Sequence, residues 1–233
     1  MNIVETAIKN ASTVIVLRNR FQNPCILIGQ RGANAAFMPN KFVFPGGAVD
    51  TEDSDIFLAS EIPSTCRERL TEDCTSNLTT PLCVAAIREL WEETGLILGL
   101  KMDWLGTTPD AWRSFAAAGY VPSAERLQFV FRAITPRGRP RRFDARFFIV
   151  DAEHLTGNLD DFSNASDELS NLQWVPLHHA HKFDLPFITE VVLTDVAGRI
   201  AQNSAPSSVP FFKNNDEADE FLRLRGYVAP DQW

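Results

Sequence analysis

The sequence has few of the features that mark a secreted, membrane-spanning or zinc-binding protein. Its four cysteines form no Cys-x-x-Cys pair, and no histidine accompanies them at the spacing of a zinc site, so we interpret them as reduced thiols of a cytoplasmic protein. No uncharged apolar run approaches the roughly 20 residues that cross a bilayer, and residues 1–5 are not a basic segment followed by an apolar one. We therefore expect neither secretion nor a membrane partner.

Positive charge is also scarce. The chain carries 22 Lys and Arg against 30 Asp and Glu, for a net charge of -8, whereas a surface that binds nucleic-acid phosphates needs clustered excess positive charge. This balance disfavours a nucleic-acid partner, including RNA as a substrate, and an anionic substrate would need a local device such as a metal ion. With 45% hydrophobic residues, the chain can bury one sizeable core, so we expect residues 1–233 to form a single domain.

Short β-branched or aliphatic runs indicate strands, and segments with helical periodicity lie between and after them. Residues 54–79 are polar and mixed in charge, and we interpret them as an insertion; residues 203–233 are expected to form a C-terminal helical extension. Predicted strands cover 13–17, 25–28, 41–44, 127–131, 146–150 and 172–175, and predicted helices cover 80–94, 109–118, 186–202 and 216–224.

Two segments of the sequence point to chemistry, and the first is Pro45-Gly46-Gly47, directly after a predicted strand. Adjacent glycines allow close approaches that a Cβ would forbid, so either another group lies against this turn or it is a plain tight turn.

The second segment is the helix expected from Thr80 as N-cap, with Pro81 in its first turn, to a stop at Gly95. At about 100° per residue, Glu89, Glu92 and Glu93 share one face, opposite an apolar face. Like charges at this spacing repel unless a cation neutralises them, and hard oxygen ligands suit Mg²⁺ or Mn²⁺. The alternative is a solvated acidic face on a surface helix.

Together these segments resemble the Nudix box. The stretch from Arg88 to Leu96 matches its second half, and Phe44-Pro45-Gly46-Gly47 matches its opening. In that family a glutamate follows the opening glycine after five residues, where this chain has Asp53, and the Arg-Glu pair comes much earlier than Arg88 does. The resemblance therefore implies a Nudix box interrupted by residues 54–79, as in the branch that includes peroxisomal coenzyme A diphosphatases, and a Nudix-type α/β/α sandwich with a mixed sheet.

The resemblance also implies roles for residues at matching positions. Glu92 and Glu93 would ligate the metal, Glu89 would ligate it or accept a proton from water, and Arg88 would orient a glutamate. The carbonyl of Gly46 would join the ligands, as would Glu168, for which the neighbouring Asp167 is an alternative. Substrate-binding residues would be Arg31, Gly47, Arg141 and Arg142; the last two belong to the basic segment 137–142, which is otherwise interpreted as a solvated hairpin tip.

These assignments predict a metal-dependent hydrolase that cleaves the diphosphate linkage of a small nucleoside diphosphate derivative, with coenzyme A or acyl-coenzyme A as the first candidate substrate. The short coenzyme A signature upstream of the glycine turn is incomplete, because Ala36 or Phe37 and Asn40 stand where a second arginine and a glycine are expected. ADP-ribose or NADH is therefore the alternative substrate, and a non-catalytic Nudix-like ligand-binding regulator is the alternative class of function. The oligomeric state, with a homodimer included, is left open.

Overall fold

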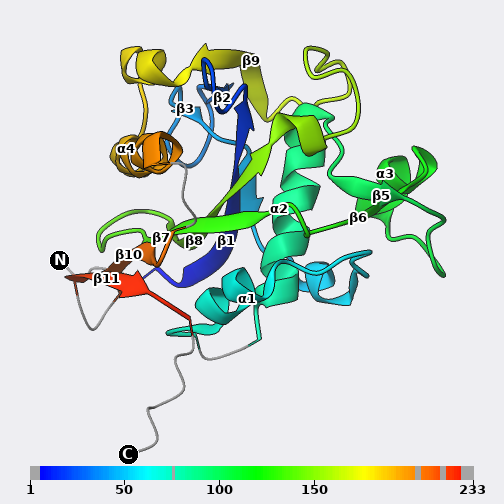
Figure 1. The fold of residues 1–233 in the computed structure, drawn as a ribbon, viewed down its shortest axis with the longest axis horizontal. Coiled ribbons are helices and arrows are strands. Elements are labelled where there is room, and N and C mark those ends of the chain that lie inside the picture. Colours follow the sequence, from blue (N-terminus) through cyan, green and yellow to red (C-terminus); the bar gives the residue numbers. More distant parts are fainter. Residues whose placement is uncertain (1–5, 75–76, 203–205, 216–218, 227–233) are drawn as a thin grey trace, which may run out of the picture.

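The computed structural model describes residues 6–74, 77–202, 206–215 and 219–226 (Figure 1). Its strands are β1 (Ile8–Arg18), β2 (Cys25–Arg31), β3 (Phe42–Val43), β4 (Gly46–Ala48), β5 (Gly99–Lys101), β6 (Tyr120–Pro122), β7 (Gln128–Ile134), β8 (Arg142–Asp151), β9 (Leu169–Pro176), β10 (Val209–Asn214) and β11 (Asp219–Leu224). The α-helices are α1 (Ser64–Thr71), α2 (Thr79–Thr94), α3 (Arg113–Ala117) and α4 (Phe187–Gln202), and short 3₁₀ turns are η1 (Thr51–Asp55), η2 (Asp110–Trp112), η3 (Ala152–His154) and η4 (Leu177–Lys182).

A mixed sheet forms the centre of the protein, in the order β11-β10-β7-β8-β1-β2-β3, with β4 also paired to β1 and β9 to β2. Strand β1 runs parallel to β8 and antiparallel to β2 and β4. The small β5-β6 hairpin lies beside α3, outside the main sheet (Figure 1). The fold is therefore mixed α/β with a mixed sheet, as the sequence predicts.

Side chains of β1 alternate between the two faces of the sheet. Val14 and Val16 pack in a core with α1 and α2, whereas Ile15 and Leu17 pack in a second core under α4. All four are fully buried, and burial of each such side chain is worth roughly 1.5–3 kcal/mol. Helices thus cover both faces of the sheet (Figure 1).

Helix α2 matches its predicted range closely. Its C-terminal stop is Gly95, which has φ 73° and donates its backbone N–H to the carbonyl of Trp91, as expected for a glycine in the left-handed region after a helix. The predicted N-cap is wrong, because the N-cap is Leu78 and makes no side-chain cap bond. The hydroxyl of Ser12 instead donates to the carbonyl of Leu82 at 2.6 Å and ties the first turn of α2 to β1.

Two other predictions are also wrong. The helix expected at 216–224 is a strand over its described part, because β11 pairs antiparallel with β10 at the edge of the sheet and Leu224 is buried in the α1–α2 core. The proposed helical extension 203–233 is therefore a β-hairpin where it is described, and residues 203–205, 216–218 and 227–233 lie outside the described part. The expected turn at Gly46 and Gly47 begins the short strand β4, which pairs with β1.

The insertion 54–79 packs into the same core as the rest of the chain, apart from residues 75 and 76, which lie outside the described part. Its apolar side chains Ile56, Ile62, Cys66 and Leu70 are buried against α2 and the sheet. None of the described helices is both long and apolar enough to span a membrane.

Candidate active site

Strand β4 and helix α2 meet through the two glycines and the glutamates that the sequence singles out. The backbone N–H of Gly46 donates to Glu93 Oε2 at 2.7 Å. A Cβ at Gly47 would lie 2.4 Å from Glu89 Oε1, and one at Gly46 would lie 2.4 Å from the carbonyl oxygen of Ser12. Both glycines are therefore required by close approach, and the group that lies against Gly47 is the carboxylate of Glu89.

Arg88 connects the acidic side chains around it. Its Nε and Nη2 donate to the two carboxylate oxygens of Asp53 at 3.0 and 3.1 Å, and its Nη1 donates to Glu89 at 2.9 Å and to Glu92 at 3.1 Å. Nη2 also donates to the carbonyl of Ala48 at 3.0 Å. Burial alone would lower the pKa of Arg88, but the hydrogen bonds to Asp53 and the charge of Glu89 raise it above its ordinary value. Arg88 thus stays charged and holds two of the three glutamates in place.

Asp53 is the partner of Arg88 that the predicted site residues omit. It is 1% exposed, lies in η1 and also accepts the backbone N–H of Asp50 at 2.8 Å. The signal that identifies it is its spacing after Gly47, which is the spacing of the first glutamate in the Nudix box. The insertion separates Asp53 from Arg88 in the sequence, and the fold brings them into contact.

The glutamates of α2 lie in a site that disfavours negative charge. Burial raises the pKa of Glu89 to about 7, although Arg88 opposes the shift, and burial together with the charge of Glu89 raises the pKa of Glu93 to about 8. Glu93 is 1% exposed, and its Oε1 has no hydrogen-bond partner among the described residues. Buried oxygen ligands that lack a counter-charge fit a hard divalent cation.

In the described part of the chain, no group of three Asp, Glu, His or Cys side chains is already arranged to hold a metal ion. Arg88 and Gly46 hold one oxygen each of Glu89, Glu92 and Glu93, and the second oxygen of each carboxylate is not held by them.

Two further predicted residues act on this site through their charge. The carboxylate of Glu168 raises the pKa of both Glu89 and Glu93, and the guanidinium of Arg31 lowers that of Glu93. Glu168 directly precedes β9, and Arg31 pairs with Leu169 at the end of β2. Asp167, the alternative to Glu168, lines a shallow hollow with Ser163 and other residues of the loop before β9. The electrostatic contacts favour Glu168.

The basic segment 137–142 divides into exposed and buried residues. Arg141 is exposed in the β7–β8 loop. Arg142 is only 2% exposed, and its guanidinium donates to the carbonyls of Thr135 at 3.0 Å and Asn214 at 2.8 Å. Arg142 therefore links the start of β8 to the ends of β7 and β10, and we do not assign it a contact with the substrate. The ring of Phe143 packs against Phe37 with centroids 5.3 Å apart, which places this loop beside the segment that follows β2.

Comparisons with known proteins find similarity to Nudix hydrolases. No family model matches the sequence. A provisionally named nudix hydrolase 7 of Caenorhabditis elegans is 26% identical over 162 residues, which cover 64% of this chain and 46% of the relative. The chain thus spans about half the length of that curated relative.

One solved structure extends the likeness to the fold. The crystal structure of a NUDIX hydrolase from Alicyclobacillus acidocaldarius is 26% identical and has a TM-score of 0.60, with 86% of this chain and 99% of that chain covered. A C. elegans Ap4A hydrolase, solved as a binary complex, is more distant, at 17% identity and a TM-score of 0.44, with 83% of this chain and 99% of that chain covered.

Proposed function

Because this chain belongs to the Nudix hydrolase superfamily, we propose that it hydrolyses the diphosphate linkage of a small nucleoside diphosphate derivative with the help of a divalent cation. The observation that carries the proposal is the contact of Arg88 with Asp53, Glu89 and Glu92. This contact reassembles in three dimensions a motif that the insertion divides in the sequence. A regulator that only binds its ligand would not need the complete set of box carboxylates.

Mg²⁺ or Mn²⁺ is the cation that the donor set suits. Oxygens that Arg88 does not contact remain on Glu89 and Glu92, and Glu93 Oε1 has no partner among the described residues. Burial raises the pKa of both Glu89 and Glu93, which a bound cation would offset. We assign the ligand positions to Glu89, Glu92, Glu93, the carbonyl of Gly46 and Glu168. The cation would screen the phosphate oxygens and acidify a coordinated water.

The side chains of the protein would position the substrate and accept the proton of the attacking water. As the alternative to ligating the cation, Glu89 would accept the proton of the attacking water. Its carboxylate lies against Gly47, and Arg88 donates to one of its oxygens. Water attacks one phosphorus atom, and the other phosphate leaves with the P–O bond electrons. Arg31, whose Nε is buried without a partner among the described residues, would bind a phosphate oxygen.

Coenzyme A or an acyl-coenzyme A remains the first candidate substrate, supported by the interrupted box and by the exposed Arg141. ADP-ribose or NADH is the second candidate, and the burial of Arg142 favours it, because less positive charge is left to bind a 3′-phosphate. Loops rather than the fold decide between them. No disulfide joins the described cysteines. We interpret them as reduced thiols and therefore propose a cytoplasmic location.

A panel assay tests the activity. Coenzyme A, ADP-ribose, NADH, nucleotide sugars and dinucleoside polyphosphates are incubated with the full chain in Mg²⁺, in Mn²⁺ and in chelator. We expect metal-dependent hydrolysis of at least one compound at its diphosphate linkage. Tight binding of a nucleotide without turnover under any of these conditions would instead support the non-catalytic regulator.

A further inference from the structure

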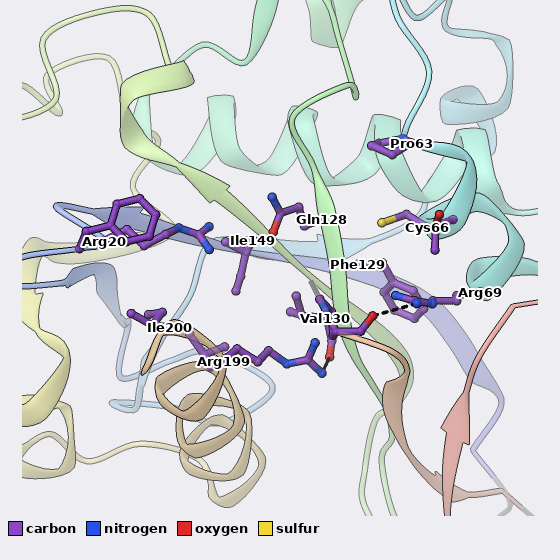
Figure 2. Close-up of a pocket in the computed structure, with 14 residues that line it drawn as sticks. Arg20, Pro63, Cys66, Arg69, Gln128, Phe129, Val130, Ile149, Arg199 and Ile200 are labelled. Atoms are coloured by element: carbon purple, nitrogen blue, oxygen red, sulfur yellow. Dashed lines mark hydrogen bonds between the residues drawn. The ribbon is translucent and has the colours of Figure 1, made fainter. Parts of the chain in front are cut away.

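A pocket of about 470 Å³ lies at the edge of the sheet that β10 leaves uncovered. In the described structure, β10 pairs with β7 at Arg132 and Ala133, and no described strand pairs with the first residues of β7 on that side. Helix α1 and helix α4 lie across this gap, and the loop between β1 and β2 closes one end (Figure 2). Its apolar lining is built by Pro63, Phe129, Val130, Ile149, Val196 and Ile200.

Three arginines from three separate elements line this pocket. Arg20 comes from the loop after β1, Arg69 from α1 and Arg199 from α4. Figure 2 shows Arg69 and Arg199 extending from opposite sides toward the strand that carries Phe129 and Val130. Each arginine has a buried nitrogen without a hydrogen-bond partner in the described structure: Nη2 of Arg20, Nε of Arg69 and Nη1 of Arg199.

The charges of two of these arginines are balanced, and that of the third is not. Arg20 Nε donates to Asp151 at 2.7 Å, and Arg199 Nε donates to Asp195. Arg69 is only 7% exposed, its Nη2 donates to the carbonyl of Pro206 at 2.9 Å, and no described carboxylate lies within ion-pair distance. A buried guanidinium without a counter-ion is costly, so an anion in this pocket would neutralise the charge of Arg69.

We propose that this pocket binds an organic anion, a single carboxylate or phosphate carried on an apolar body. The anionic group would lie against Arg69, and the apolar body would extend along Phe129 and Ile149 toward Arg20, which lies at the opposite end of the pocket (Figure 2). The volume is that of a small-molecule site. None of the lining residues belongs to the carboxylate site on α2 and β4, so the pocket is a second binding site, and the proposal is independent of the catalytic one.

Isothermal titration calorimetry on the full chain tests the proposal with four probes of matched chemistry: octanoate, octyl phosphate, octanol and inorganic phosphate. We expect octanoate or octyl phosphate to bind with one-to-one stoichiometry, and the stronger of the two identifies the anionic group. Octanol and inorganic phosphate should bind at least tenfold more weakly, because each lacks one half of the recognised chemistry. Equal binding of octanol, equal binding of inorganic phosphate, or no binding of either amphipathic anion would overturn the proposal.

Substitutions test whether the anion binds in this pocket. Arg69→Met keeps the length of the side chain and removes its charge, and it should weaken binding of the stronger probe at least tenfold, whereas Arg69→Lys should weaken it less. Arg69→Gln, which also removes the charge, provides a second test if Arg69→Met does not fold. Arg113→Met, at an exposed arginine on α3, and Glu93→Gln, in the carboxylate site, should leave the affinity unchanged. Unchanged affinity in folded Arg69→Met or, failing that variant, in Arg69→Gln would refute the site.

Discussion

The guanidinium of Arg88 and the carboxylate of Asp53 form a buried bidentate ion pair, with N–O distances of 3.0 and 3.1 Å. Asp53 lies in η1, before the insertion, and Arg88 lies in α2, after it. The same guanidinium contacts Glu89 and Glu92. The Arg88–Asp53 pair therefore holds together the segments on either side of the insertion, and the same guanidinium holds two of the carboxylates. Loss of the pair should affect both folding and catalysis.

Asp53→Asn should lower kcat at least tenfold and reduce stability by about 3–5 kcal/mol, because it leaves Arg88 buried with less compensating charge. Urea unfolding and steady-state kinetics measure the two effects. Asp55→Asn, at an exposed aspartate of the same turn, is the matched control and should change neither quantity. A full-rate Asp53→Asn enzyme would show that Arg88 does not need this partner.

Glu93→Gln should abolish most turnover, by about three orders of magnitude, because it removes one ligand charge while it keeps the size of the side chain. The folded protein without metal should be as stable as the parent or more stable, since repulsion from Glu89 falls. Glu190→Gln, at an exposed glutamate of α4, controls for a change in net charge. Wild-type turnover in Glu93→Gln would contradict the assignment of the metal site.

The stability of the metal-free protein should fall as the pH rises from about 4.5 to about 8. The folded-state pKa values of Glu89 and Glu93 are raised to about 7 and about 8 from 4.5. In this interval the folded state therefore keeps protons that the unfolded state has released. Each group contributes a slope of up to about 1.4 kcal/mol per pH unit.

Urea unfolding in chelator from pH 5 to pH 8.5 measures this slope, and Glu93→Gln should reduce it. Mg²⁺ should raise the melting temperature more at pH 8 than at pH 5, because it binds the ionised carboxylates. A flat stability profile without metal would show that these glutamates are not poorly compensated.

Gly47→Ala should displace the carboxylate of Glu89, since the added Cβ would lie 2.4 Å from Glu89 Oε1. We expect kcat to fall at least tenfold and KM to change less. Gly198→Ala adds the same methyl group in α4, where no atom lies within 4 Å, and it should keep full activity and gain about 0.5–1 kcal/mol of stability. Equal activity of the two variants would argue against the close approach of Glu89 and Gly47.

Substitutions of Arg141 and Arg142 should have different effects: loss of Arg141 should change substrate specificity, and loss of Arg142 should lower stability. Arg141→Ala removes an exposed charge and should lower kcat/KM for coenzyme A more than for 3′-dephospho-coenzyme A, with stability almost unchanged. Arg142→Ala removes buried hydrogen bonds to Thr135 and Asn214 and should cost about 1–3 kcal/mol. An unchanged preference for the 3′-phosphate in Arg141→Ala, or a strong preference for ADP-ribose in the parent, would exclude this role for the loop.

The parts of the site that depend on local geometry could be predicted from the order of the amino acids. The period of an α-helix places Glu89, Glu92 and Glu93 on one face of α2 wherever that helix lies, and Gly95 ends the helix because a left-handed residue is needed there. Strands β1, β2, β7, β8 and β9 could likewise be predicted, because their β-branched and apolar runs are buried in the sheet. The adjacent glycines before Ala48 left two alternatives, a close approach or a plain tight turn, and only the structure shows that Glu89 lies against Gly47.

Tertiary structure alone decided the contacts between segments that lie far apart in the chain. The pairing of Asp53 with Arg88, the burial of Arg142, and the meeting of Arg20, Arg69 and Arg199 around one pocket all depend on which surfaces of the sheet and helices are buried together. The segment predicted as a final helix is strand β11 for the same reason: pairing with β10 and burial of Leu224 outweigh a weak local preference. Local spacing fixes the direction of a side chain within its own element, whereas the partner of that side chain is fixed by the packing of the whole chain.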